Sequence, residues 1–478
     1  MLPNQINMVG LRDYQGVEGF FGAMAGSEVD FLNKALAAGS EINAPSPFTA
    51  GDGFALRVES LESTLKVTTY KMEHLRFFRG IPKLPAYNTV EEFNRLESYG
   101  ANEESAFISE GDLPNEDDSL FSRQYALVKF LGTTRRVTHP MTLVRTAHGP
   151  AIAQETTNGT MHLLKMLERA LFYGDHTLSA LQFDGFEKLI RDNSPTTNVV
   201  DLRGAPLSED ALVDGCLIVN DAPNYGNPTH LHLNPKVKSD LTKTFFPKER
   251  GPSLNAGGGN MIGLDIKGFT AQSGDIAFEP NVFITDGGAP GAAVGDATRR
   301  PATPVAGASA TPPAALSQFA ADDAGNYLVY AVACNRYGRS AAVWVDGAVI
   351  AVAAGDEITF TLTPGSTVDV EWYDIYRTPV GGAAATARRV LRVPNAAGAG
   401  AQTINEYNAN IPGCTSAFLF QQNLECMSFR QLAPMLKIPL AVIDSSVRWM
   451  QLIYGVPVLY TPGKVLLYRN VGRASGHL

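Results

Sequence analysis

The sequence predicts an α+β protein in which one long helix supports strands that come from distant parts of the chain. Three features predict this class: helical spacing of apolar residues near the middle of the chain, alternating polar and apolar residues before it, and many short strand-like segments after it. A length of 478 residues allows two or three domains, each with its own core.

The long helix is the most clearly predicted element. Pro150 suits the first turn of a helix and Gly174 suits the C′ position, so we expect the helix to span Gly149–Tyr173. At about 1.5 Å per residue its length would be roughly 37 Å, enough to cross an ordinary domain. Its apolar stripe is modest and includes a glycine, which predicts a support for a closely packed sheet: Ile152, Thr156, Gly159, Leu163, Leu167 and Leu171.

Composition excludes several classes of protein. Hydrophobic residues make up 45% of the chain and charged residues 18%, which is typical of a globular protein. A net charge of −9 argues against a protein that grips nucleic acid through its phosphates, although an acidic wall can still enclose DNA. Four scattered cysteines without a CxxC motif predict neither a disulfide framework nor a structural zinc site.

The sequence carries no predicted membrane or secretion signal. It has no run of eighteen apolar residues, and its first residues lack the basic end and apolar core of a signal peptide. We therefore expect a product that is made, or assembled, in the cytosol.

The first 54 residues are rich in Gly, Ala, Asn and Ser, with one helix predicted around Val29–Ala38. Such a segment buries little apolar surface alone. Two interpretations remain open: a loosely packed extension, or an arm that packs on a neighbouring subunit.

Residues 55–136 predict a projecting β-hairpin. An entering strand begins near Thr64, a short helix follows at Val90–Glu97, and a turn-rich acidic stretch precedes a strand-like return. A hairpin with an exposed edge persists most easily when a neighbouring chain covers it. Its acidic residues either pair across subunits with the basic residues of the return strand or remain solvated; those basic residues are Arg123, Lys129, Arg135 and Arg136.

Two further helices are predicted after the long one. Ser208 or Leu207 caps a helix whose first turn is acidic. A strand at 229–233 is followed by a second helix, with Asn234 as its N-cap and Pro235 at its first position. Short strands are predicted again around 276–284.

A change of composition marks an inserted module. Residues 286–318 are dominated by Gly, Ala and Pro and predict a linker, and a second Gly/Ala-rich linker ends near Gln402. Between them lie five or more short strands, including one with Trp372, Tyr373, Ile375 and Tyr376, which predict an antiparallel sandwich. This pattern loosely resembles fibronectin type III and other immunoglobulin-like modules.

Two short runs carry a more specific resemblance. The run ERALFYGD at 168–175 and the run FDGF at 183–186 resemble the end of the "spine" helix in major capsid proteins of tailed bacteriophages. The run N-P-x-V-x-x-D-L at 234–241 resembles the apical domain of that family. The last part of the chain resembles its long closing strand, and its apolar contacts to the spine helix would come from Leu459, Val465 and Leu467.

The resemblance implies a Hong Kong 97-type capsid fold with an inserted all-β sandwich. The module would interrupt one parent domain, whose two halves lie at 137–285 and 403–478. The implied organisation is an N-terminal arm at 1–54, an entering strand and extended loop at 55–136, the spine helix with the peripheral and first apical parts at 137–285, an immunoglobulin-like insertion at 286–402, and a return to the apical and peripheral parts at 403–478.

The function implied by the resemblance is structural. Copies would form hexamers and pentamers and close an icosahedral shell around double-stranded DNA, with portal, scaffolding and possible decoration proteins as partners. The place would be the virion, assembled in the host cytoplasm, and the inserted sandwich would project outward. Because the sequence starts at Met1 without a long charged helical leader, we expect a separate scaffolding protein and no large N-terminal cleavage.

No enzymatic activity, catalytic residue, cofactor or metal is predicted. The sequence contains no GxSxG, GxxxxGK[ST] or HExxH motif. His230 and His232 share one face of a predicted strand, as a metal site would require, but no third ligand is recognisable nearby. A metal hydrolase, an encapsulin-like protein compartment and a surface adhesion protein built on the sandwich are the alternatives.

Overall fold

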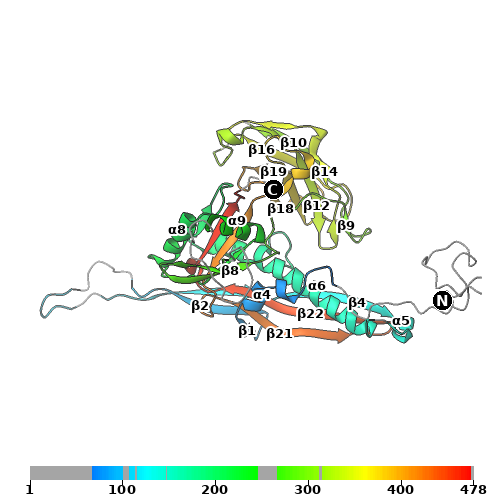
Figure 1. The fold of residues 1–478 in the computed structure, drawn as a ribbon, viewed down its shortest axis with the longest axis horizontal. Coiled ribbons are helices and arrows are strands. Elements are labelled where there is room, and N and C mark those ends of the chain that lie inside the picture. Colours follow the sequence, from blue (N-terminus) through cyan, green and yellow to red (C-terminus); the bar gives the residue numbers. More distant parts are fainter. Residues whose placement is uncertain are drawn as a thin grey trace, which may run out of the picture. The chain divides into compact units, whose positions relative to one another are not determined.

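The computed structural model describes residues 67–100, 107–113, 116–146, 148–245, 266–311 and 315–474 (Figure 1). The predicted arm at 1–54, with its helix at Val29–Ala38, lies outside the described residues. Apart from Thr146 and His148, all described residues belong to one compact unit. The fold of this unit is mixed α/β, and none of its described helices is both long and apolar enough to cross a membrane.

Helix α6 (Ala151–Tyr173) confirms the predicted long helix. It begins directly after Pro150, which stands one residue before the helix and not within its first turn. The predicted stripe positions Gly159, Leu163, Leu167 and Leu171 are all buried. A Cβ at Gly159 would collide with the Gln451 side chain, whose Nε2 donates a hydrogen bond to the Thr156 carbonyl at 2.9 Å. The glycine therefore allows a strand to lie close against the helix.

That strand belongs to the first of two main sheets. The order of this sheet is β1-β21-β22-β4, and both β21 and β4 pair antiparallel with β22. Figure 1 shows α6 running along β22 and β4, which it contacts. The strand bounds are β1 (Lys83–Pro85), β4 (Lys129–Thr138), β21 (Met427–Pro439) and β22 (Ser446–Leu459).

The second main sheet has six strands in the order β5-β23-β20-β6-β8-β7. Strands from before residue 285 and after residue 414 lie side by side in it, so the two parts of the sequence form one sheet. The strand bounds are β5 (Val199–Asp201), β6 (His230–Leu233), β7 (Gly268–Ala271), β8 (Gly274–Pro280), β20 (Thr415–Phe420) and β23 (Val465–Val471).

Two predicted helix starts are confirmed beside this sheet. The Ala211 N–H donates to Ser208 Oγ at the start of α8 (Glu209–Asn220). The Lys236 N–H donates to Asn234 Oδ1 at the start of α9 (Pro235–Phe245). The other helices in the described part of the chain are α4 (Phe77–Gly80), α5 (His139–Leu143) and α7 (Phe186–Asn193). It also has 3₁₀ turns at Met72–His74, Thr196–Asn198, Ala321–Asp323, Val345–Gly347, Ala384–Thr386 and Pro462–Lys464.

The predicted closing strand is two strands, because the 3₁₀ turn at Pro462–Lys464 separates β22 from β23. Leu459, Val465 and Leu467 nevertheless lie in the same buried core as the leucines of α6, as predicted. This core joins the long helix to both main sheets.

Among the described residues, the strands between 294 and 406 pair only with one another. They enclose a separate apolar core that contains Tyr327, Phe360, Tyr373 and Ile375. The strand bounds are β9 (Val294–Gly295), β10 (Val305–Thr311), β11 (Gly325–Tyr327), β12 (Val329–Asn335), β13 (Gly338–Arg339), β14 (Val343–Trp344), β15 (Ile350–Val352), β16 (Glu357–Thr363), β17 (Trp372–Arg377), β18 (Arg388–Pro394) and β19 (Gln402–Glu406).

The prediction of a linker over 286–318 was wrong for part of that range. Strand β10 lies within it and pairs antiparallel with all seven residues of β16. The residues of β10 that pack on the separate core are Ala306, Ala308 and Ala310. Because alanine is small, these positions give no clear alternation of polar and apolar residues in the sequence. Strand β19 also pairs with β16 and continues to Glu406, beyond the predicted boundary at 402.

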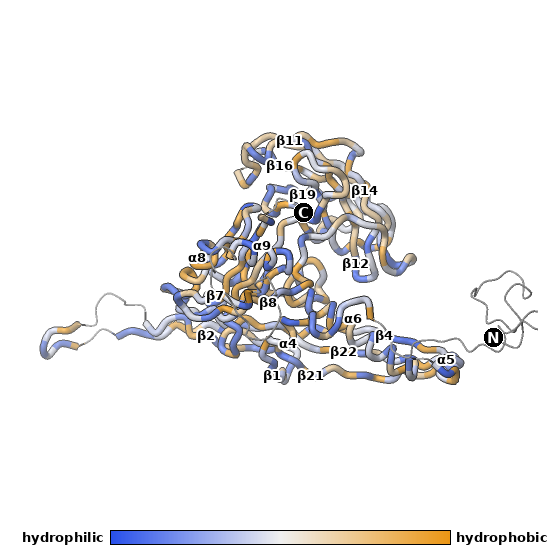
Figure 2. Tube along the Cα trace, viewed as in Figure 1, coloured by the Kyte–Doolittle hydropathy of each residue, from blue (hydrophilic) through white to orange (hydrophobic). Residues whose placement is uncertain are grey.

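Two predictions about the hairpin were also wrong. The segment predicted as a helix at Val90–Glu97 is strand β2 (Val90–Ser98), which pairs antiparallel with β3 (Leu120–Leu127). The described part of the predicted entering strand, 67–71, forms no strand. A hairpin exists, but its arms are β2 and β3. The described residues at its end include both hydrophobic and hydrophilic positions (Figure 2).

Candidate functional site

Glu168, the first residue of the ERALFYGD run, is a buried anchor. Its Oε1 accepts hydrogen bonds from the Phe77 N–H at 2.8 Å and from Asn281 Nδ2 at 2.7 Å, and its Oε2 accepts one from the Phe78 N–H at 2.8 Å. Burial raises the pKa of Glu168, and these donated hydrogen bonds oppose that shift. One carboxylate thus ties α6 to the start of α4 and to the segment that follows β8.

The glycines of the two runs form a close backbone contact. The Gly185 N–H donates to the Gly174 carbonyl at 2.8 Å. A Cβ on Gly174 would lie 2.5 Å from the Phe183 carbonyl oxygen, and one on Gly185 would lie 2.6 Å from Gly174 N. Gly174 ends the helix in an extended conformation (φ −61°, ψ 144°), so the prediction of a C′ glycine was wrong. The glycine is required for space and not for a left-handed backbone.

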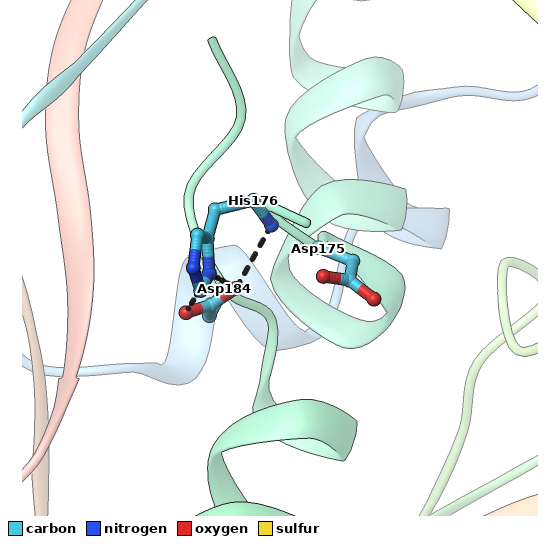
Figure 3. Close-up of side chains that lie close together, drawn as sticks. All are labelled: Asp175, His176 and Asp184. Carbon is cyan, nitrogen blue, oxygen red and sulfur yellow. Dashed lines mark hydrogen bonds and ion pairs between the residues drawn. The ribbon is translucent and has the colours of Figure 1, made fainter. Parts of the chain in front are cut away.

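Asp175, His176 and Asp184 gather at this junction. Figure 3 shows the imidazole of His176 beside the carboxylate of Asp184, with Nδ1 and Oδ1 2.7 Å apart. The Asp175 carboxylate is already engaged by the Lys188 ammonium at 2.9 Å and by the Thr177 N–H at 2.8 Å. Because the Lys188 ammonium already pairs with Asp175, the geometry favours a structural turn over a metal centre.

The two histidines of β6 share one face, as predicted, with ring centroids 6.4 Å apart. His232 is buried, and burial lowers its pKa to about 3, so it is neutral near pH 7. Burial lowers the pKa of His230 against the opposing charge of Glu279, and Glu279 is itself paired with Arg76 at 2.9 Å. Among the described residues, no third ligating side chain joins the two rings.

One face of the β2–β3 hairpin is anchored on the body of the chain. The Phe93 ring packs edge-on against Tyr460 with centroids 5.0 Å apart. Arg95 donates hydrogen bonds to the carbonyls of Tyr460 and Leu459, at 2.5 and 3.0 Å. Glu91 lies 3.5 Å from Arg430. These contacts hold the base of the hairpin in place.

The opposite face of the hairpin is exposed and carries several large apolar side chains. Register places Val90 opposite Leu127 and Leu96 opposite Phe121, and Tyr125 lies between these pairs. Phe121 is 67% exposed and Tyr125 is 71% exposed. We name these five residues the hairpin face. The exposed polar residues Glu92, Asn94 and Arg123 lie on the same face, between the two apolar pairs. Exposed large apolar side chains flanked by polar ones are typical of a surface that another molecule covers.

The basic residues predicted to meet acidic residues of another subunit are engaged within the chain. Arg123 pairs with Glu92 at 2.6 Å, Arg135 with Glu155 at 3.4 Å, and Arg136 with Asp444 at 2.9 Å. Lys129 Nζ donates to the Ala180 carbonyl at 2.7 Å. All four basic side chains therefore already have partners within the chain, which weakens the hypothesis that they pair with acidic residues of another subunit. The hairpin face is the stronger candidate for contact with another subunit.

A second exposed apolar area lies at the β4 and β22 end of the first sheet. Helix α5 and the residue after it contribute Met141, Leu143 and Val144, and the turn between β21 and β22 contributes Val442 and Ile443. The tertiary contact of α5 is with β4 and α6. The described chain thus offers two separate apolar surfaces.

Comparison with known proteins gives one consistent answer. No family model matches the chain. It is 26% identical over 447 residues to a "Putative major capsid protein" of Enterococcus phage phiEF24C, covering 89% of this chain and 92% of the relative. It is 24% identical over 442 residues to the "Major capsid protein" of Staphylococcus phage K, with the same coverage. The chain is a structural capsid shell protein. The encapsulin-like alternative has less support, because these relatives are phage capsid proteins.

Solved structures give weaker likenesses. The chain matches that of Gordonia phage Cozz with a TM-score of 0.45 and 10% identity, covering 91% of this chain and 99% of the other. It matches the "Capsid of native GTA particle computed with C5 symmetry" with a TM-score of 0.44 and 10% identity, covering 91% and 100%. Likenesses of this size carry no argument about assembly.

Proposed function

We propose that this chain is the major capsid subunit of a tailed phage with a Hong Kong 97-type fold. Copies assemble as hexamers and pentamers into an icosahedral shell that encloses double-stranded DNA. The observation that carries the proposal is the relationship to phage major capsid proteins over 89% of the chain, joined to an exposed hairpin face that another copy would cover.

Assembly would draw its strength from repetition. Burying a large apolar side chain contributes roughly 1.5–3 kcal/mol, so a few residues of the hairpin face supply only a weak contact between two copies. Each subunit makes several such contacts, and closed symmetry makes the release of one subunit depend on breaking all of them. The shell is therefore stable although each pairwise contact is weak.

The parts of the chain have distinct proposed roles. Residues 1–54 form an arm on a neighbouring subunit, 55–136 the extended loop, and 137–285 with 403–478 the peripheral and apical parts. The strands between 286 and about 406 form an immunoglobulin-like module inserted into the parent domain and projecting from the shell. Their separate core and closed pairing support this division.

The partners follow from the same proposal. The subunit meets its own copies, portal and scaffolding proteins, and decoration proteins in the host cytoplasm before it becomes part of the virion. It encloses DNA without sequence-specific binding, in keeping with its net charge of −9. No enzymatic activity or cofactor belongs to this function.

Electron microscopy of the purified full chain, with and without its scaffolding protein, tests the proposal. We expect closed particles with five-fold and six-fold clusters of subunits. A discrete folded species that forms no particle under either condition would contradict it.

A further inference from the structure

Two cavities of about 230 and 420 Å³ share part of their lining. Thr285, Gly287 and Arg389 contribute to both. The first cavity also reaches α7 and β23, and the second reaches α6 and β13. Their sizes approach or fall within the range of small-molecule sites, which is about 300–1,000 Å³.

The linings are strongly basic in a protein whose net charge is −9. Asp175, Glu187 and Asp286 are the three acidic side chains that line the cavities. The eight basic side chains are Arg169, Lys188, Arg191, Lys236, Arg339, Arg389, Arg392 and Arg469. The cavities thus concentrate positive charge well beyond what their own carboxylates neutralise.

The two lysines are neutralised, but most of the arginines are not. Lys188 pairs with Asp175 at 2.9 Å, and Lys236 pairs with Asp286 at 2.7 Å. In the described part of the chain, no carboxylate forms an ion pair with four of the six arginines: Arg169, Arg191, Arg339 and Arg469.

Arg389 and Arg392 share a single carboxylate as their ion-pair partner. Asp374 lies 3.1 Å from Arg392 Nε and 3.9 Å from Arg389 Nη1. Burial and the neighbouring guanidinium of Arg392 lower the pKa of Arg389. The surrounding protein together with Arg392 and Arg339 lowers the pKa of Arg169. These guanidiniums repel one another across the cavities.

We propose that the paired cavities bind a multivalent oxyanion of the phosphate class. A guanidinium presents a planar fork of N–H donors that matches the oxygens of a phosphate group, and a bound anion would remove the mutual repulsion of the arginines. The arginines come from α6, α7, β13, β18 and β23, so one anion would join the body of the chain to the strands between 294 and 406.

Isothermal titration calorimetry of the full-length protein with sodium tripolyphosphate tests the site. Arg169→Gln and Arg339→Gln remove positive charge without stranding a carboxylate, and each should weaken binding by about tenfold or more. Arg299→Gln is the matched control, because Arg299 lies in the same group of strands, is exposed, and lines neither cavity. Equal binding by wild type and both cavity variants would overturn the proposal.

Thermal unfolding gives a second readout, measured first without anion and then with tripolyphosphate. At low salt, Arg169→Gln should raise the Tm of the free protein, because it removes one repelling charge. It should also reduce the further rise in Tm that a fixed concentration of tripolyphosphate causes in wild type. A lower Tm for Arg169→Gln without anion would contradict the argument from repulsion. Citrate and sodium chloride at matched ionic strength serve as comparisons, and an effect of either equal to that of tripolyphosphate would refute a phosphate-class site.

Discussion

Glu168 shows how a single buried carboxylate can organise a junction. It accepts three hydrogen bonds, two of them from backbone N–H groups at the start of α4. Burial raises the pKa of Glu168, so ionisation has a cost that the donated hydrogen bonds offset. The sequence placed this residue in the ERALFYGD run, but nothing in the run indicated that its partners would come from residues near 77 and 281.

We expect Glu168→Gln to lower the free energy of unfolding by about 1–3 kcal/mol. The amide NH₂ would face a backbone donor and leave a buried N–H unpaired, which costs about this much even after the buried charge is removed. Urea unfolding of the full chain measures the change. Glu155→Gln on the same helix is the control, because Glu155 is partly exposed, pairs with Arg135 and accepts one further hydrogen bond, from Asn158 Nδ2. A Glu168→Gln protein as stable as this control would contradict the anchor role.

His232 makes stability depend on pH. Its pKa is lowered to about 3 in the folded chain and is about 6.5 in an unfolded one, so the unfolded chain binds more protons between these values. The contribution of His232 is therefore complete above about pH 6.5 and declines as the pH falls toward 3. The expected loss between pH 6.5 and pH 4 is on the order of 3 kcal/mol.

His232→Leu should flatten this part of the curve of stability against pH. Unfolding by urea at several pH values measures the slope. His139→Gln serves as the control, since His139 is exposed and its substitution should leave the slope unchanged. A His232→Leu protein that retains the wild-type slope would show that other groups cause the acid sensitivity.

At the scale of elements, the end of α6 depends on the space between two backbones. Gly174→Ala would place a methyl group against the Phe183 and Ala170 carbonyl oxygens, and backbone atoms cannot move aside as a side chain can. We expect a destabilisation of about 3 kcal/mol, measured by the midpoint of urea unfolding. In Gly307→Ala, the matched control in β10, the nearest atom is 3.4 Å from the new Cβ. Similar midpoints for the two variants would be inconsistent with this account.

Under the proposed function, we expect assembly to depend most on the hairpin face. The double variant Phe121→Ser with Tyr125→Ser should change the stability of a single subunit little, because both side chains are exposed. It should weaken association by roughly 3–5 kcal/mol per contact, or about 100-fold or more. Light scattering during assembly measures this loss.

Trp344→Ser is the comparison for the hairpin variant, because it also removes an exposed aromatic side chain but lies in β14, away from the hairpin. It should assemble like wild type. Normal particle yield from the hairpin variant would show that assembly does not depend on the hairpin face.

The strengths and failures of sequence interpretation also lie at this scale. Helix α6 was predictable because its stripe repeats at helical spacing over 23 residues. Strand β2 was misread as a helix because its short run contains helix-favouring residues, while its alternation becomes meaningful only when Phe93 and Arg95 find partners near residue 460. Strand β10 was hidden because alanines fill its inward positions.

At the scale of the molecule, the division into sequence segments was easier to predict than the contacts between them. A composition change marked the strands between 294 and 406, but their arginines meet Arg169 and Arg469 only in the folded chain. The pairing of the return-strand cations with Glu92, Glu155 and Asp444 was likewise not predictable, because it joins residues up to about 300 positions apart.

The central claim is that the exposed apolar faces of the chain are covered by other copies of itself. Sedimentation velocity of the purified full chain, over a wide range of concentrations, tests it most directly. We expect small subunits below a threshold and large closed particles above it, with few intermediates and with the threshold raised by Phe121→Ser and Tyr125→Ser. A compact monomer at every concentration, unaffected by the hairpin substitutions, would contradict the account.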